Sequence, residues 1–161
     1  ACAKSRHAQE IQVILAGKGP LEKKYRRLAE KLPNPIVMSF YEPARLLEIL
    51  HMADLYVHTS DAEIEAMSCM EAFACGLVPV IADSPRSATP QFALDGRSLF
   101  PAGDTDALAE RIDWWIEHPA ERQEMERRYA EHAKQYSLAE SIRRTEEMFR
   151  QAIAEQRETR A

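Results

Sequence analysis

The sequence predicts an α/β fold in which a Rossmann-like parallel sheet is flanked by helices. Two observations support this class: short β-branched runs alternate with longer segments of helical period, and turn residues lie at each junction. The chain has 161 residues, of which 45% are apolar and 29% charged, so it can bury a real core. The sequence has no internal repeat and no low-complexity tract. We therefore expect one domain spanning residues 1–161.

The expected strands are short and follow one another at regular intervals. The first, 11–16, reads Ile-Gln-Val-Ile-Leu-Ala and ends at a Gly-Lys-Gly-Pro turn. Pro79 lies near the start of the fourth strand and has no backbone donor, which argues against a fully hydrogen-bonded centre there. The remaining strands are expected at 36–39, 55–58, 78–82 and 98–100.

The segments between the first strands contain residues that typically start or end helices. Residues 21–32 place their charges on one side and stop at a pair of prolines. Pro43 suits the first turn of a helix at 44–52, where its missing N–H would be unpaired anyway. A third helix starts near residue 66 and stops at Gly76, which favours a left-handed cap.

The second half of the chain predicts three more helices. Asp104 can cap the first of them, and Pro119 is well placed to open the second. Ser137 and Glu140 have the spacing of a capping box for the last helix. The expected helices are 104–118, 119–134 and 138–155.

The first nine residues look like the end of a helix rather than the beginning of a domain. No strand pattern precedes residue 11, and the sequence does not start with Met. We therefore expect the chain to be a fragment of a longer protein.

Composition excludes several functional classes. Twenty-six acids against 21 bases give a net charge of −5, which disfavours a broadly basic nucleic-acid binder. Cys2, Cys69 and Cys75 form no C-x-x-C pair, so neither a disulfide framework nor a zinc site is indicated, and a cytoplasmic location is expected. No apolar run approaches the roughly 18 residues of a membrane span. Any membrane contact would be peripheral, at the inner face of the cell membrane.

Ligands of parallel α/β sheets bind at the carboxyl ends of the strands, where four loops of this chain should converge. Gly17 and Gly19 would allow close backbone approach to a ligand, although a tight strand-to-helix turn explains them equally well. His58 at a strand end is expected to be a packed or capping histidine rather than a base. The four loops are 17–20, 40–43, 58–67 and 83–91.

Two acids eight positions apart, Glu63 and Glu71, flank the expected start of the third helix. The helix N-terminus near 66–68 offers unpaired N–H groups and a positive dipole end to an anion such as a diphosphate. Composition alone favours a simpler interpretation, in which Glu63 and Glu65 are solvated acids favoured by the helix dipole and Glu71 is an exposed helix residue. Glu71, however, lies on an otherwise apolar helix, so its burial would require a partner such as a ligand hydroxyl.

At these residues the sequence resembles the group 1 retaining glycosyltransferases, family 4 of the GT-B fold, over nearly the whole chain as their C-terminal, donor-binding domain. The E-x7-E motif falls on Glu63 and Glu71. The segments 84–94 and 112–115 resemble the bacterial cholesterol α-glucosyltransferases and related lipid glucosyltransferases. Further family features appear in order at Gly17-x-Gly19-Pro20, 53–57, Ser60, 71–80, Pro90, Asp95-Gly96 and Gly103-Asp104.

The resemblance implies a retaining transfer of a hexose, such as glucose from UDP-glucose, to an acceptor such as a membrane lipid, sterol or glycan. Glu71 would accept hydrogen bonds from the ribose hydroxyls. Glu63 would be the catalytic carboxylate, contacting the hexose and supporting the electron-poor anomeric centre. The donor partner is thus a nucleotide sugar, and neither a metal nor a cofactor is implied.

The other donor contacts implied by the resemblance are made mainly by backbone. The N–H groups of Ala66, Met67 and Ser68 would hold the diphosphate. The base would lie against the backbone near Tyr41, in the segment 40–42, with the turn that contains Gly17 and Gly19 beside the nucleotide.

Departures from the family pattern add expectations. Glu65-Ala66 stands where Phe-Gly is usual, and Ser87-Ala88-Thr89 replaces a Gly-Gly pair. The family's diphosphate-binding Arg and Lys, its first strand and its acceptor domain have no counterpart here, which implies weak donor binding and no transfer by these 161 residues alone. In a Rossmann-like order that first strand is central, so its two neighbours would have open edges.

Two other classes of function remain open at this point. Another GT-B enzyme, such as a phosphorylase or a sugar-nucleotide epimerase, would share the phosphate- or nucleotide-binding loops. A non-catalytic nucleotide-binding module would share the fold alone. The arginines and lysines of the last two helices interleave with acids, which favours a solvated face over a patch for anionic lipid.

Overall fold

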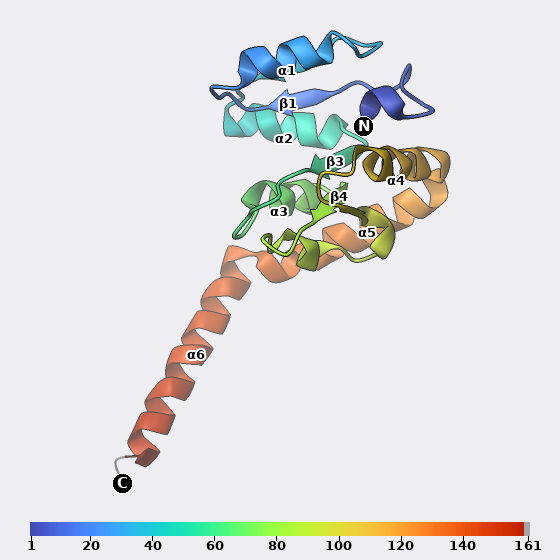
Figure 1. The fold of residues 1–161 in the computed structure, drawn as a ribbon. Helices are drawn as coiled ribbons and strands as arrows, with labels where there is room; N and C mark the ends of the chain where they lie inside the picture. The colour runs from blue at the N-terminus through green and yellow to red at the C-terminus, as the bar shows by residue number, and fades with distance from the viewer. Residues whose placement is uncertain (160–161) are drawn as a thin grey trace.

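A computed structural model describes residues 1–159 as a mixed α/β fold with parallel sheets flanked by helices (Figure 1). The expected class is therefore confirmed. The strands are β1 (Ile14–Ala16), β2 (Val37–Ser39), β3 (Leu55–His58), β4 (Val78–Asp83) and β5 (Leu99–Pro101). The helices are α1 (Glu22–Ala29), α2 (Pro43–Met52), α3 (Met67–Ala74), α4 (Thr105–Glu117), α5 (Pro119–Ala133) and α6 (Leu138–Thr159).

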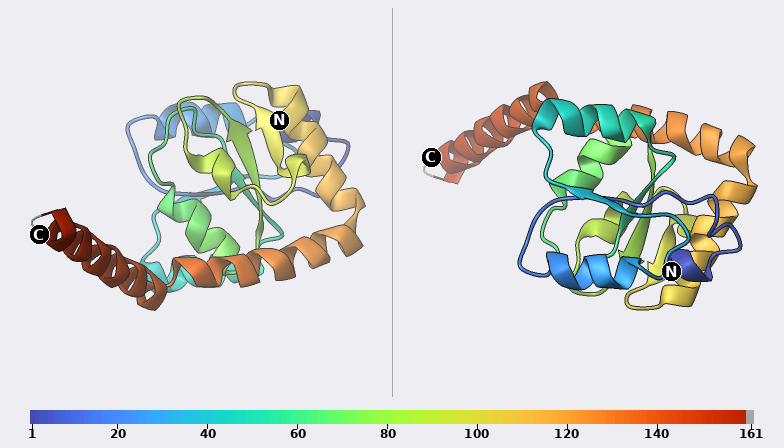
Figure 2. Two further views of the ribbon diagram at one scale, coloured as in Figure 1. Left: turned by 90° about the horizontal axis from the view of Figure 1, so that it is seen from below. Right: turned by 90° about the horizontal axis from the view of Figure 1, so that it is seen from above.

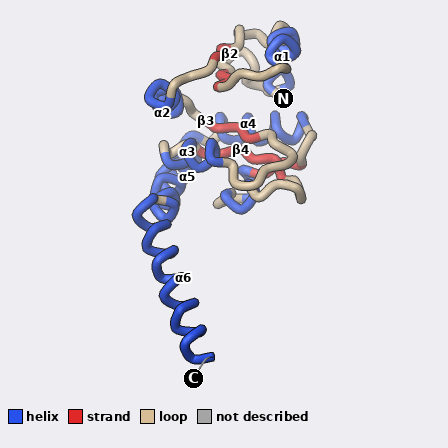
Figure 3. The backbone as a smooth tube through the Cα atoms, turned by 90° about the vertical axis from the view of Figure 1, so that its left-hand side faces the viewer, coloured by secondary structure: helices blue, strands red, loops and turns tan. Residues whose placement is uncertain are grey.

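The strands form two separate parallel sheets rather than one. β1 pairs with β2, and β3, β4 and β5 form a second sheet in that order. Within the described residues, β1 and β3 each keep one edge without a strand partner, as the sequence led us to expect. Figure 3 shows the two sheets apart. The unpaired edges expose apolar side chains that include Ile14, Leu15 and Val57.

The main core surrounds β4. Val78, Val80 and Ile81 are fully buried there, beneath Phe73 of α3 and Trp115 of α4. Helices α3, α4 and α5 cover this sheet, as the views from below and above show (Figure 2). The larger sheet therefore carries most of the buried apolar surface, which is the dominant stabilising term in folding.

Pro79 occupies a position in β4 that tolerates a missing donor. β4 is the middle strand, but β5 runs alongside it only from Ile81 onward. At Pro79 the sole strand neighbour is β3, where Tyr56 is the register partner. The expectation that hydrogen bonding is incomplete at this point is confirmed.

A smaller core joins α2 to the larger sheet. It consists of Leu50 on α2, Ala72 on α3 and Leu77 just before β4. Because α2 follows β2 in the chain, this cluster is one of the links between the smaller sheet region and the larger one.

The N-terminal segment corrects one expectation. It contains a short 3₁₀ turn at Cys2–Lys4 followed by further turns, not the end of an α-helix. Ser5 donates a hydrogen bond to the buried carboxylate of Asp113 on α4, and the backbone N–H of Arg6 donates to the same carboxylate at 3.1 Å. A buried carboxylate needs such donors. The backbone of this segment is therefore placed to donate to Asp113 and does not form a continuous series of α-helical hydrogen bonds.

Most helix ends follow the predicted chemistry. Asp104 accepts from the N–H groups of residues 106 and 107, and Gly76 adopts a left-handed φ of 87° after α3. Ser137 accepts from the N–H of Glu140 at 3.3 Å. The Glu140 carboxylate, however, binds Arg143 and Arg144, so the capping box is only half formed.

Helix α6 leaves the body of the molecule and ends four residues beyond its predicted end (Figure 1). Arg143, Arg144 and Arg150 pair with acids three or four positions away, as in Arg143 with Glu140, which fits the expected solvated face. Among the described residues, no helix has the length and apolarity that crossing a membrane requires.

Candidate functional site

The loops at the carboxyl ends of the strands meet in two groups. At the smaller sheet, the Nζ atom of Lys18 lies 4.8 Å from the ring centre of Phe40, which brings the 17–20 turn to the loop after β2. The N–H of Gly17 donates to the carbonyl of Ser39 at 2.8 Å. Gly17 and Gly19 both have open space where a side chain would begin, so a ligand could approach their backbone.

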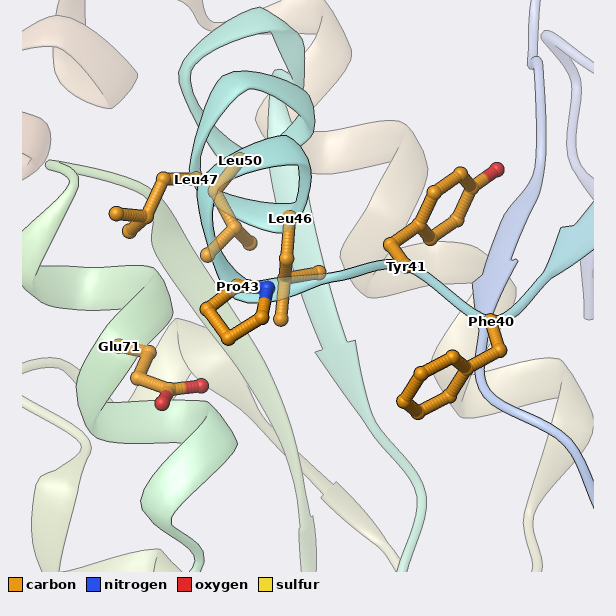
Figure 4. A pocket seen from close by; sticks show the side chains of 7 residues that line it. All are labelled: Phe40, Tyr41, Pro43, Leu46, Leu47, Leu50 and Glu71. Atoms are coloured by element: carbon orange, nitrogen blue, oxygen red, sulfur yellow. The ribbon is translucent and has the colours of Figure 1, made fainter.

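A cavity of about 240 Å³ lies between the loop after β2, helix α2 and helix α3 (Figure 4). Glu71 is the sole acid among the described residues that line it, and its carboxylate points toward Pro43 (Figure 4). The wall is otherwise apolar or aromatic and consists of Phe40, Tyr41, Pro43, Leu46, Leu47 and Leu50.

Glu71 is exposed rather than buried, so the question of a buried carboxylate without a partner does not arise. Within the described residues it makes no hydrogen bond or ion pair, and both oxygens are free to accept. Glu65 is likewise exposed and without a partner in this part of the chain. Neither acid is engaged in stabilising the fold.

The backbone of Glu63 is hydrogen-bonded to the loop that follows β4. Its N–H donates to the carbonyl of Arg86 at 3.3 Å, and its carbonyl accepts from the N–H of Ala88 at 2.9 Å. A second link forms where Arg86 pairs with Asp61. These contacts fix the loop that precedes α3, and the Glu63 side chain remains partly exposed.

The start of α3 has two features that suit a ligand site. Its first N–H groups, from Ala66 to Ser68, bond to no acceptor within the described residues, and no side chain caps the helix. Ala66 is left-handed, with φ 49° and ψ 58°, although it is not glycine and is 5% exposed. Backbone strain of this kind often occurs at binding sites.

A chain of polar groups connects the start of α3 to Glu63. The Ser68 hydroxyl lies 2.8 Å from the Tyr56 hydroxyl, which lies 3.1 Å from Nδ1 of His58. The other ring nitrogen of His58 is 4.0 Å from a carboxylate oxygen of Glu63. Burial raises the pKa of Tyr56 to about 12 and lowers that of His58, while Glu63 opposes the second shift.

The structure thus groups the residues predicted from the sequence into three neighbourhoods. Tyr41 and Glu71 line one cavity, Glu63 lies at the loop before α3 with Ala66, Met67 and Ser68, and the two glycines lie in the turn beside Phe40. Sequence reasoning missed Lys18 and the leucines of α2. Their signals were a cation between two glycines and leucines at positions 46, 47 and 50 on one helical face.

His58 differs from the sequence expectation in one respect. It is packed, with 6% of its surface exposed, as expected. A carboxylate nevertheless lies within 4.0 Å of its Nε2 atom, which the sequence did not indicate because Glu63 is in the following loop. Within the described residues, no cluster of three or more potential ligands could hold a metal ion.

Comparisons with known proteins identify the family of this chain. The family model "Glycosyl transferases group 1" matches residues 1–136. The protein EpsD of Bacillus subtilis (strain 168), described as a glycosyltransferase, is 30% identical over 140 residues, which are 85% of this chain and 35% of EpsD. This chain therefore spans about a third of the length of that relative.

Solved structures show the same relationship. The catalytic domain of cholesterol-α-glucosyltransferase from Helicobacter pylori superposes with a TM-score of 0.81 at 48% identity, covering 84% of this chain and 86% of that one. The GtfA/B complex has a TM-score of 0.74 at 22% identity, covering 93% of this chain and 32% of that one, and supports the fold alone. The family match covers well over half of the sequence, and the chain belongs to the group 1 glycosyl transferases.

Proposed function

We propose that this chain is the donor-binding domain of a retaining hexosyltransferase that takes glucose from UDP-glucose. The observation that carries the proposal is the cavity in which Glu71 faces an apolar and aromatic wall. Glu71 lies on α3, and Glu63 lies in the loop that precedes this helix. Such a cavity offers flat apolar contact on one side and an acceptor of hydrogen bonds on the other. A nucleoside has the matching chemistry, because it joins a flat base to a ribose with two hydroxyls.

The size of the cavity supports a ligand that enters it only in part. Its volume of about 240 Å³ is below the roughly 300–1,000 Å³ typical of sites that enclose a whole small molecule. In the proposed pose, the base lies near Tyr41 and Phe40, and the ribose hydroxyls donate to Glu71. The diphosphate and the hexose then extend outside the cavity along α3.

The positive groups along that path fit a diphosphate. The unbonded N–H groups of Ala66, Met67 and Ser68 and the dipole of α3 favour an anion. Lys18, between Gly17 and Gly19, adds a cation next to Phe40 of the cavity wall. Negative charge develops on the leaving diphosphate during transfer, so these groups would stabilise the transition state. The proposal requires no metal and no cofactor.

Glu63 is proposed as the catalytic carboxylate. It lies at the N-terminal side of α3, next to the proposed diphosphate position, where the hexose of a nucleotide sugar would be. As the bond to the leaving group breaks, the anomeric carbon becomes electron-poor, and a nearby carboxylate stabilises that charge.

The proposed acceptor is a membrane lipid or sterol. This part of the proposal rests on the 48% identity to the catalytic domain of the Helicobacter pylori cholesterol-α-glucosyltransferase. EpsD extends well beyond the region that it shares with this chain. A second domain outside these 161 residues would accordingly select the acceptor and make peripheral contact with the inner face of the membrane.

Calorimetric titration of the 161-residue chain with UDP-glucose tests the donor site. We expect weak binding that Glu71→Ala reduces by about tenfold or more, because hydrogen bonds to a charged group contribute about 1.5–3 kcal/mol. Glu48→Ala is the matched control, since Glu48 is an exposed acid on the neighbouring helix α2 that pairs with Arg45 and with no other described residue. Equal affinity of the wild-type chain and Glu71→Ala would overturn the proposed site.

A further inference from the structure

His58 has a buried nitrogen whose partner the structure does not supply. The residue lies at the carboxyl end of β3, and only 6% of its surface is exposed. Its Nε2 atom makes no hydrogen bond within the described residues. A buried polar atom without a partner is costly and calls for an explanation. A carboxylate oxygen, Oε2 of Glu63, lies 4.0 Å from Nε2.

The surroundings of the imidazole favour one tautomer. A lone pair on Nε2 would face the negative carboxylate of Glu63 and be repelled, whereas an Nε2–H would be attracted. With the proton on Nε2, Nδ1 accepts from the hydroxyl of Tyr56, 3.1 Å away, and the Tyr56 oxygen accepts from Ser68 at 2.8 Å. The hydrogen-bonded series then runs from Ser68 through Tyr56 to His58. Within the described residues, Nε2 has no hydrogen bond and lies 4.0 Å from the Glu63 carboxylate.

Glu63 has one oxygen available for this contact. Its Oε1 atom accepts from the backbone N–H of Ile64 at 3.1 Å, which leaves Oε2 on the side of His58. The gap of 4.0 Å is about 1 Å longer than a hydrogen bond. Such contacts are often long in a site without ligand and shorten when the substrate fills it.

We propose that His58 is a positioning residue: its Nε2–H closes onto Glu63 when the donor binds and holds the carboxylate at the anomeric centre. This inference rests on the proposed role of Glu63. The hydroxyl of Ser68 is at the proposed diphosphate position, and Glu63 is at the proposed sugar position. Tyr56 and His58 therefore connect the two sides of the sugar–phosphate bond that breaks. His58 itself touches neither the sugar nor the leaving group.

The tautomer and the pairing can be tested without any donor. Nitrogen-15 NMR of the imidazole in the 161-residue chain should show His58 neutral at pH 7, with its proton on Nε2. Glu63→Gln should lower the pKa of His58 further, since the carboxylate raises it. Glu71→Gln is the matched control and should leave that pKa unchanged. A proton on Nδ1, or a pKa insensitive to Glu63→Gln, would overturn the proposed pairing.

The catalytic consequence is tested by two amide substitutions in the complete transferase that contains this domain. A Gln side chain can place its N–H near the position of Nε2, whereas Asn reaches only the position of Nδ1. His58→Asn should lower kcat with UDP-glucose by about tenfold or more with little change in KM, and His58→Gln should restore most of the loss. His51→Gln on the exposed surface of α2 controls for the substitution itself.

The outcomes separate this inference from the proposed function. Equal kcat in His58→Asn and wild type, or equal losses in the Asn and Gln variants, would refute the positioning role. If the complete wild-type protein neither binds UDP-glucose nor transfers glucose, the proposed function fails, and the NMR experiment still decides whether His58 and Glu63 are paired.

Discussion

The two sheets differ in how much they bury. The smaller region, β1, α1 and β2, has no buried residue in α1 and three exposed positions along β1. The larger region buries almost the whole of β4 beneath α3, α4 and α5. Both contribute to the candidate site, because Phe40 and Tyr41 come from the loop after the smaller sheet and Glu71 from the larger region. The proposed donor would therefore bind between a well-packed wall and a weakly packed one.

The largest expected effect comes from replacing an apolar side chain with alanine in each of the two regions. Phe73 on α3 is fully buried and packs against Phe92 and Tyr129, with ring centres 5.6 and 5.9 Å away. Phe73→Ala should lower the free energy of unfolding in urea by about 3–5 kcal/mol. Leu28→Ala on α1, where the side chain is 53% exposed, should cost about 0.5 kcal/mol or less. Similar losses would show that the smaller sheet is as well packed as the larger.

Hydrogen exchange should show the same contrast along the backbone. Local opening requires little free energy where few apolar contacts are buried, so the amides of β1 and β2 should exchange about 100-fold faster or more than those of β4. UDP-glucose at saturating concentration should slow exchange in the 17–41 segment, because one wall of the proposed cavity comes from it. Protection of β1 equal to that of β4 in the free chain would contradict this comparison.

Lowering the pH should reduce the difference in stability between the two regions, because it weakens an ion pair in the larger one. The guanidinium of Arg97 holds the pKa of Asp95 at about 2, below its ordinary value of 3.8, in the loop next to β5. The folded-state pKa is lowered, so the stabilisation is complete above about pH 4 and is lost as the pH falls toward 2. Because Arg97 is partly exposed, we expect about 1 kcal/mol. In urea titrations at pH 6 and pH 2, Asp95→Asn should remove this part of the pH dependence, and an unchanged pH profile would exclude the pairing.

The contrast also explains which features could be predicted from the sequence. Strands and helices with local signals were found within a few residues, as with Pro43, Asp104 and Gly76, since caps depend on neighbouring residues. The division into two sheets was not predicted; the resemblance to the family led us to expect only the two open strand edges. Contacts between separate loops, such as Lys18 over Phe40 and His58 beside Glu63, depend on three-dimensional packing and left no periodic signal.

The smallest expected effect concerns the backbone of the two regions. Ala66 is left-handed in the larger region, and replacing it with glycine would relieve a strain of about 1–2 kcal/mol. The same change removes a buried methyl group worth about 0.8 kcal/mol and gives the unfolded chain more freedom. These effects oppose each other, so Ala66→Gly should change the free energy of unfolding by about 0.5 kcal/mol or less.

Gly19→Ala is the counterpart in the smaller region. Apart from Gly19 and its two chain neighbours, no described residue has an atom within 4 Å of the position that the new methyl group would take. The alanine also reduces the freedom of the unfolded chain. It should therefore stabilise the fold slightly, by about 0.4–1 kcal/mol, in the same urea titrations. A loss of stability on Gly19→Ala would mean that the turn beside Lys18 is tightly packed, and the smaller region would then be more ordered than its exposed strands indicate.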